Sequence, residues 1–262
     1  MKITLFTSNN NRHNYLINLL SNISDELFVI QENIKIHQGI VPGHYPASEL
    51  MKKYFKQVND AQHKFFGNSH VNSSSKNKKI LPVTLGDLNK YSLKFLSDFL
   101  KSDIYVVFGS SYIKGELADY LVKQKAINIH MGVSPYYRGT DCNFWALYDN
   151  NPHLVGATIH MLSKGLDSGP MLYHAMSNIK SNAFEYTMST VKSAFHSIAE
   201  RIKDKSIFEI KPLIQDREKE IRYSKKIEFN EKVVKNYFSK DINLKSKDFN
   251  NSLLKEPYFL NN

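Results

Sequence analysis

The stretch KITLFTSNNNRHNYLINLLSNISDELFVIQE, residues 2–32, decides the fold class. Its first segment, Lys2–Ser8, contains Ile3, Leu5 and Phe6 and is interpreted as a short strand buried on both faces. A polar turn and apolar residues at helical spacing follow, and the stretch ends in a second strand, Asp25–Glu32. A strand–helix–strand opening is the usual start of a parallel sheet, so the sequence predicts an α/β fold.

Strands and helices continue to alternate along the chain. The pattern predicts a Rossmann-like, mostly parallel sheet flanked by helices, with a small C-terminal appendage. Residues 68–79 are polar and of low complexity, so we expect an exposed loop there, and another loop is expected at residues 41–47. Residues 80–89 are expected to contain a short strand and a helix cap. The further strands are expected at residues 103–111, 126–132, 154–163 and 171–178, and the further helices at residues 48–66, 91–101, 114–124, 143–150 and 183–203.

The domain organisation follows from length and pattern. The chain has 262 residues, of which 42% are hydrophobic, and this is enough for one large domain with its own core. The regular pattern weakens after the last long helix, where a proline, mixed charges and scattered aromatic residues follow. We therefore expect one main domain over residues 1–205 and a small appendage over residues 206–262.

Composition excludes several classes of protein. No run of about 18 apolar residues is present, so no membrane-spanning helix is predicted. The apolar start is too short for a secretory signal, which favours a cytoplasmic protein. A single cysteine, Cys142, excludes an intrachain disulfide. No metal site is expected, because His153, His160 and His174 lack metal-ligand spacing. The net charge of +10 is interpreted as a lysine-rich surface, which makes a nucleic-acid partner less favoured.

Two polar side chains interrupt the apolar strand at residues 126–132. Asn128 and His130 are two positions apart, so in a strand both point to the same face. Burying an amide and an imidazole is costly unless both find partners. A hydrogen-bonded core pair is one interpretation. Because the turn SPYYRG follows at once, we favour a functional site.

A carboxylate in a later loop completes the candidate site. Asp167 lies in KGLDSGP, which is either an ordinary turn or the source of a partner for His130. A carboxylate beside histidine orients the ring and tunes its pKa. An amide can stabilise an oxyanion, and the other two groups can move a proton. No serine or cysteine nucleophile stands in this set, which favours direct acyl transfer between two bound substrates.

The pattern NxHxxxxPxxRG over residues 128–139 resembles the signature of the 10-formyltetrahydrofolate-dependent formyltransferases. The segment GATIHMLSKGLDSGPML, residues 156–172, is similar to that family's Gly-x-Thr strand and Asp-x-Gly loop. The resemblance covers residues 103–175 by motif and the preceding residues by element order only.

The resemblance implies a role for particular residues and a formyl donor. Asn128, His130 and Asp167 would be the catalytic residues, and 10-formyltetrahydrofolate would be the donor. The pterin of the donor would lie in a slot lined by two segments of the chain. These cofactor-binding residues are Tyr112, Ile113, Leu162, Ser163, Lys164, Gly165 and Leu166.

The resemblance also bears on the acceptor. Within the family, methionyl-tRNA formyltransferases normally carry a larger C-terminal β-barrel domain, and the segment after residue 205 is short for one. The chain looks most similar to the bacterial sugar N-formyltransferases. Their acceptor is an amino group on a nucleotide-linked amino-deoxysugar, used for surface polysaccharide such as the O-antigen of lipopolysaccharide. Gly132, where the family often has serine, and Val133–Ser134, in place of a leucine pair, are the local departures.

Four residues are candidates for binding the acceptor. Asn10 and Arg12 precede or begin a helix and form an anion site, or merely cap the helix. Tyr137 and Arg138 belong to a sugar or base pocket by stacking, or hold the loop in place as structural residues. By resemblance alone we also expect a homodimer formed through the appendage.

Other functions remain open at this point. The same three polar residues suit formylation of methionyl-tRNA or hydrolysis of the formyl-folate. A non-catalytic module that binds RNA through its basic surface is a further alternative. The presence of all three polar residues argues against that alternative, because a module without turnover has no use for them.

Overall fold

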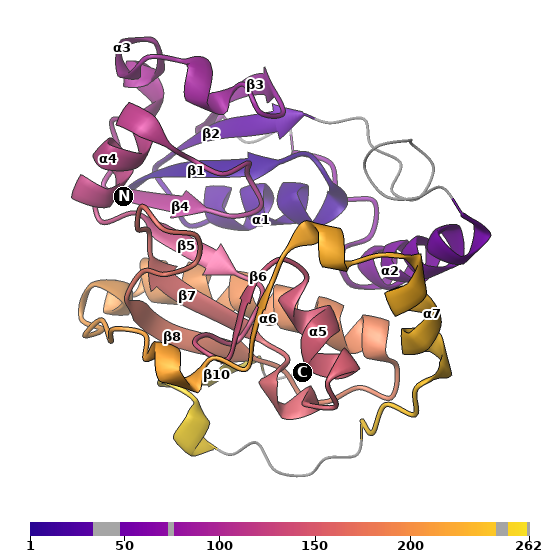
Figure 1. Cartoon of the computed structure of the whole chain (residues 1–262). Coiled ribbons are helices and arrows are strands. Elements are labelled where there is room, and N and C mark those ends of the chain that lie inside the picture. The colour runs from indigo at the N-terminus through magenta and orange to yellow at the C-terminus, as the bar shows by residue number, and fades with distance from the viewer. Residues whose placement is uncertain (34–47, 73–75, 245–250, 261–262) are drawn as a thin grey trace.

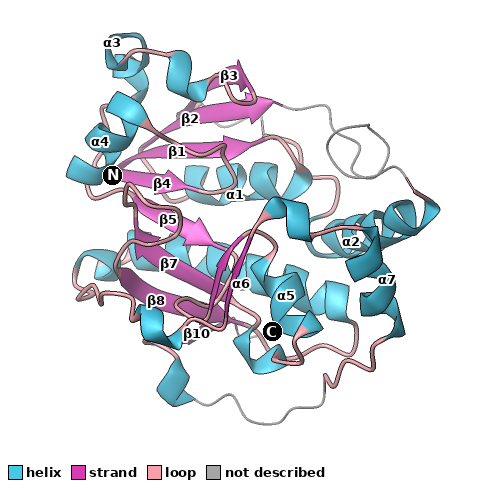
Figure 2. Cartoon of the chain, viewed as in Figure 1, coloured by secondary structure: helices cyan, strands magenta, loops and turns pink. Residues whose placement is uncertain are grey.

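An eight-stranded sheet runs through the protein in the order β10-β8-β7-β5-β4-β1-β2-β3 (Figures 1 and 2). The computed structural model describes residues 1–33, 48–72, 76–244 and 251–260. Neighbouring strands are parallel except for β7, which is antiparallel to both β5 and β8. The mostly parallel α/β fold is thereby confirmed. The strands of the sheet are β1 (Lys2–Ser8), β2 (Glu26–Asn33), β3 (Lys78–Thr84), β4 (Ile104–Val107), β5 (Ile127–His130), β7 (Ala157–Met161), β8 (Met171–Met176) and β10 (Tyr258–Phe259).

Helices cover both faces of this sheet, because its strands are apolar on both. In β1, Ile3 and Leu5 join a core with helices α1, α2 and α6, some of which lie behind the sheet in Figure 1. Phe6 points to the opposite face and joins a second core with α4, which contributes Leu117 and Leu121. The helices are α1 (Asn11–Ser21), α2 (Glu49–Phe66), α3 (Leu93–Leu96), α4 (Gly115–Lys123), α5 (Cys142–Tyr148), α6 (Ala183–Lys203) and α7 (Glu231–Ser239).

Several predicted elements are shorter than expected, among them the strands predicted at 126–132, 154–163 and 171–178, and two of the shortened elements have a local reason. The helix predicted at 91–101 is one turn of α3 followed by a 3₁₀ turn at Ser97–Phe99, where serine and aspartate have low helix propensity. Of the strand predicted at 103–111, only β4 (Ile104–Val107) forms, and it ends two residues before Gly109. Gly109 has φ +63°, and a Cβ there would come within 2.5 Å of His13 Nε2. The loop predicted at 41–47 lies outside the described residues.

The residues after α6 return to the body of the protein. β9 (Arg222–Ser224) pairs with β6 (Tyr137–Gly139) in a second, two-stranded sheet, and α7 packs against α2. β10 then adds to the edge of the main sheet beside β8. The C-terminal segment is therefore attached to the sheet and to the loop that follows β5.

The fold carries a testable pH dependence at His174 in β8. His174 Nδ1 accepts a hydrogen bond from the Lys255 amide at 2.8 Å, and Nε2 donates to the Ser134 carbonyl at 2.8 Å, so the ring is neutral. Burial lowers the pKa of His174 to about 4. In the unfolded chain His174 binds a proton near pH 6.5, whereas in the folded protein it does so only near pH 4. Acidification from pH 6.5 towards pH 4 therefore destabilises the fold.

We expect His174 to account for about 2 kcal/mol of lost stability between pH 7.5 and pH 5. Urea unfolding of the wild type and of His174→Gln measures the free energy of unfolding at pH 7.5 and at pH 5. The stability deficit of the variant relative to the wild type should shrink by that amount at pH 5. An unchanged deficit would show that the ring is not held neutral by these contacts.

Candidate active site

A cavity of about 590 Å³ lies at the carboxyl ends of β1, β4 and β5. The chain proceeds from β1 to β2 on one side and returns to β4 on the other, so the strand order reverses between β1 and β4. Ligands of open α/β sheets bind at such a point, because the loops that follow the two strands diverge and leave a crevice. The cavity wall includes residues from the loop after β4, from β5 and from the loop between β7 and β8.

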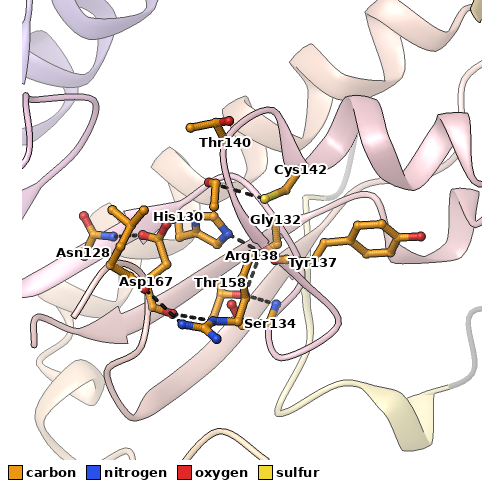
Figure 3. A network of polar contacts seen from close by, with 12 residues as sticks. Asn128, His130, Gly132, Ser134, Tyr137, Arg138, Thr140, Cys142, Thr158 and Asp167 are labelled. Atoms are coloured by element: carbon orange, nitrogen blue, oxygen red, sulfur yellow. Dashed lines mark hydrogen bonds and ion pairs between the residues drawn. The ribbon is translucent and has the colours of Figure 1, made fainter. Parts of the chain in front are cut away.

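The structure brings Asn128, His130 and Asp167 together in the wall of this cavity (Figure 3). Asn128 and His130 point from β5 to one side, whereas Ile129 between them joins the core. Asp167 reaches them from the loop between β7 and β8, where its backbone has φ +46°. Asp167 Oδ2 lies 3.3 Å from His130 Nδ1, and Asp167 Oδ1 lies 3.4 Å from Asn128 Nδ2.

His160 is a fourth member of this polar group, and the sequence-based prediction did not include it. The antiparallel register of β5 and β7 places His160 opposite Asn128, and Asn128 Nδ2 lies 2.9 Å from His160 Nε2. His160 Nδ1 lies 2.8 Å from the Met161 carbonyl. Nδ1 must donate to that carbonyl, so Nε2 is left to accept from the Asn128 amide. The sequence pattern placed His160 in a strand, but it could not show which residue of the neighbouring strand His160 would face.

Burial and charge set the protonation of the pair formed by His130 and Asp167. Burial lowers the pKa of His130, and Asp167 opposes this only in part. For Asp167, burial raises the pKa, but His130, His160 and Arg138 together outweigh burial and leave the pKa below its usual range. At neutral pH the imidazole is therefore neutral and the carboxyl ionised. The Nδ1–H of His130 then donates to Asp167, which leaves the electron pair of the ring on Nε2, 3.3 Å from the Tyr137 carbonyl oxygen.

Arg138 holds the loop that carries Asp167. The guanidinium is buried, and it donates to the Leu166 carbonyl at 3.1 Å and to the Asp167 carbonyl at 3.4 Å. Its third contact is an ion pair with Glu220 at 2.8 Å. Gln215 donates to the same Asp167 carbonyl at 2.9 Å. Residues after α6 therefore help to position the carboxylate, although they are distant from it in sequence.

Six of the seven residues predicted to bind the cofactor lie in the cavity wall. Lys164 is the exception, because its ammonium turns outward and pairs with Asp119 at 2.6 Å. Its carbonyl accepts from the hydroxyl of Tyr112, which ties the two sides of the predicted slot together. The wall includes Tyr112, Ile113, Leu162, Ser163, Gly165 and Leu166.

The four residues predicted to bind the acceptor lie in different places. Arg12 is in the cavity wall, and Asn10 is the N-cap of α1, outside the wall. Contrary to the stacking hypothesis, the structure does not bring Tyr137 or Arg138 to the cavity. Both lie in β6, which is covered by β9, and Tyr137 is fully buried with its hydroxyl bonded to Asn151 at 2.7 Å. Their roles seen here are structural.

Two features are absent from the part of the chain that the structure describes. Within it, no helix combines the length and the apolar character needed to cross a bilayer. No three side chains of His, Cys, Asp or Glu are grouped there in a way that could hold a metal ion.

Comparison with known sequences finds a similarity over the segment that carries the site. Residues 98–203 match the model of the formyl transferase family. The methionyl-tRNA formyltransferase of Thermosynechococcus vestitus is 36% identical to this chain over 73 residues, which are 28% of this chain and 22% of that protein. The match therefore spans about a fifth of the relative's length and little more than a quarter of this chain.

Comparison with solved structures shows a shared fold. The phosphoribosylglycinamide formyltransferase of Anaplasma phagocytophilum superposes with a TM-score of 0.53 at 17% identity, covering 80% of this chain and 89% of that chain. A 4-N formyltransferase from Francisella tularensis gives 0.52 at 18% identity, with coverages of 86% and 76%. The N-formyltransferase of Helicobacter canadensis, in complex with folinic acid and dTDP-3-aminofucose, gives 0.53 at 15% identity, with coverages of 90% and 79%.

Proposed function

We propose that the protein is a folate-dependent formyltransferase acting on an amino sugar, and the match of residues 98–203 to the formyl transferase family model supports this proposal. It would transfer the formyl group of 10-formyltetrahydrofolate to the amino group of a nucleotide-linked amino-deoxysugar. The observation that carries this proposal is the convergence of Asn128, His130 and Asp167 on the wall of one cavity. Such a set suits attack of an amine on a carbonyl carbon.

The donor is assigned to the slot between residues 112–113 and residues 162–166. Apolar side chains such as Ile113 and Leu162 suit the flat faces of a pterin ring, and backbone groups suit its polar edge. A relative with the same fold, the Helicobacter canadensis enzyme, was solved in complex with folinic acid. The donor would thereby place its formyl group beside the three polar side chains.

The chemistry assigned to these side chains is a direct acyl transfer. The acceptor amine attacks the formyl carbon, and the bond from that carbon to N10 of the folate breaks. One N–H of Asn128 is already bonded to His160, whereas the other faces Asp167 only at 3.4 Å and is the donor that remains for the oxyanion. The neutral His130, oriented by the ionised Asp167, takes the proton that the amine loses and returns it to N10.

The acceptor is assigned from charge and from the relatives. Arg12 and Lys226 line the same cavity, and two cations suit an anionic acceptor such as a nucleotide-linked sugar. Asn10, at the start of α1, is kept with Arg12 as part of this anion site. The two N-formyltransferases described above cover 86% and 90% of this chain, and the second of them was solved with dTDP-3-aminofucose, an amino sugar nucleotide.

A second candidate is formylation of methionyl-tRNA. It is favoured by the sequence match to the methionyl-tRNA formyltransferase of Thermosynechococcus vestitus. The net charge of +10 is compatible with a tRNA substrate. The match is confined to 28% of the chain, so we rank this candidate second.

We further propose that residues 1–205 form the catalytic domain, that residues 206–262 form an appendage, and that the protein is a cytoplasmic homodimer. Supporting the dimer, the appendage exposes several large apolar side chains, including Ile214 and Ile227. Sedimentation velocity of the purified protein tests the dimer.

An acceptor screen tests the function. The full chain is incubated with 10-formyltetrahydrofolate and either a set of nucleotide-linked 3-amino and 4-amino deoxysugars or methionyl-tRNA, and tetrahydrofolate release is followed together with the mass of the acceptor. We expect release that depends on one class of amino sugar, with a mass gain of one formyl group. Formylation of methionyl-tRNA alone would establish the second candidate. Donor hydrolysis without an acceptor, or no turnover at all, would overturn the proposal.

A further inference from the structure

A fully buried carboxylate, Glu32, lies next to the cavity but outside the polar group described above. Glu32 is in β2 and has no exposed surface. In the described part of the chain no cation pairs with it. Placing a carboxylate in such a position is costly unless hydrogen bonds replace its water. The three donors that do so come from two different loops.

Both loops follow strands of the main sheet and lie at the same edge of it (Figure 1). The amide of Gly86, after β3, donates to Glu32 Oε1 at 2.9 Å. Ser111, after β4, donates twice, from its hydroxyl to Oε1 at 2.7 Å and from its amide to Oε2. Charge-assisted bonds of this kind are about twice as strong as neutral ones, so Glu32 fixes where Ser111 lies.

The segment fixed in this way is one wall of the predicted folate slot. Ser111 directly precedes Tyr112 and Ile113, which line the cavity. A second side chain holds the same segment from the other side. Asn89 donates to the Tyr112 carbonyl at 2.8 Å and accepts from the Lys114 amide at 2.8 Å. Residues 111–114 are therefore held at each end and cannot move without breaking these bonds.

Holding the segment at both ends leaves its middle available for a ligand. Hydrogen bonds within the described part of the chain use the Ser111 and Lys114 amides and the Tyr112 carbonyl, whereas neither the amide nor the carbonyl of Ile113 takes part in one. A slot that recognises a ligand through its backbone binds well only if that backbone is already in place, because ordering a loop on binding costs free energy.

We propose that Glu32, assisted by Asn89, is a positioning residue for the folate donor. It holds residues 111–114 in the conformation in which Ile113 presents its backbone to the pterin. The inference rests on the proposed function, because it requires that the donor occupies this slot. Glu32 touches no substrate and takes no part in proton transfer. Its effect is expected in the affinity for the donor, and little effect is expected on the chemical step or on the acceptor.

The test measures binding of folinic acid, which needs neither the acceptor nor turnover. Isothermal titration calorimetry is carried out on the wild type, on Glu32→Gln and on Glu26→Gln. Glu26 is the matched control, because it lies in the same strand but is 42% exposed in a surface pair with Lys2. In Glu32→Gln the new side-chain amide offers only one acceptor oxygen and turns an N–H towards a donor. We expect folinic acid to bind about 10-fold more weakly to Glu32→Gln and unchanged to Glu26→Gln.

Kinetics separate positioning from general support of the fold. With an acceptor found in the screen, the KM for the donor should rise about 10-fold in Glu32→Gln, while kcat and the KM for the acceptor stay within about 3-fold. A deterioration of all three parameters together with a lower melting temperature would mean that Glu32 only stabilises the fold, which overturns the inference.

Asn89→Ala tests the same segment if Glu32→Gln does not fold. Asn89 is partly exposed, so its loss disturbs the core less. It should also weaken folinic acid binding, by about 3- to 10-fold for two lost hydrogen bonds. If the folded variants bind folinic acid as the wild type does, the inference is wrong while the proposed function stands. If the wild type itself binds no folinic acid, the assignment of the donor fails instead.

Discussion

Replacement of His130 by alanine is expected to lower kcat by about 100- to 10,000-fold, because the attacking amine then has no base to receive its proton. The structure places the ring beside Asp167 in the cavity wall, and burial keeps it neutral by lowering its pKa. The initial rate of tetrahydrofolate formation with saturating donor and acceptor measures the effect. The KM for the donor should change much less than kcat, since the ring meets the reacting group and not the pterin.

His153→Ala is the matched control for this prediction. His153 lies in the 3₁₀ turn Pro152–Leu154, outside the cavity wall, and its loss should leave kcat unchanged within about twofold. The wild-type rate should also fall in acid with a midpoint below pH 6.5, because protonation of His130 removes the base and its pKa is lowered. A wild-type rate in His130→Ala would exclude the mechanism proposed above.

Replacement of Arg138 by methionine is expected to lower the free energy of unfolding by about 3–5 kcal/mol. The guanidinium is buried and satisfies the carbonyls of Leu166 and Asp167 together with the carboxylate of Glu220. Methionine fills similar space but leaves these groups without their donor. Urea unfolding measures the loss. Because Glu220 is 27% exposed and can regain some water, the lower end of the range is favoured.

The same change should lower activity, because the loop that carries Asp167 loses its anchor. Arg217→Met, at an exposed position, should change stability by less than about 0.5 kcal/mol. In the double variant Arg138→Met/Glu220→Leu the loss should be smaller than in Arg138→Met, because no carboxylate is left without a partner. Equal losses in both variants would show that the ion pair is not the source of the effect.

The fold class and part of the site were predictable because they depend on local patterns. The strand pattern of Lys2–Ser8 and the helix after it indicated a mostly parallel sheet, and the structure has one. The two-residue repeat of a strand placed Asn128 and His130 on one face from the sequence alone. Asp167 was identified from its loop and from the family resemblance, since nothing local shows where a loop carboxylate points.

Other features depended on which distant segments meet. His160 joins the polar group only because the register of β5 and β7 sets it opposite Asn128. Arg138 turned inward because β9, contributed by residues far along the chain, covers the strand that carries it.

The amino-acid sequence by itself determined the main strands and helices of residues 1–205 and the faces that their side chains take, because these follow from periodicities of two and 3.6 residues, whereas β6, β9, β10 and α7 were not predicted. Only the tertiary structure decided that Glu32 is buried against the loops after β3 and β4, and that Asn128, His130, His160 and Asp167 share one cavity wall. The physical reason is that strand register and loop path, which set these distances, depend on the packing of the whole sheet.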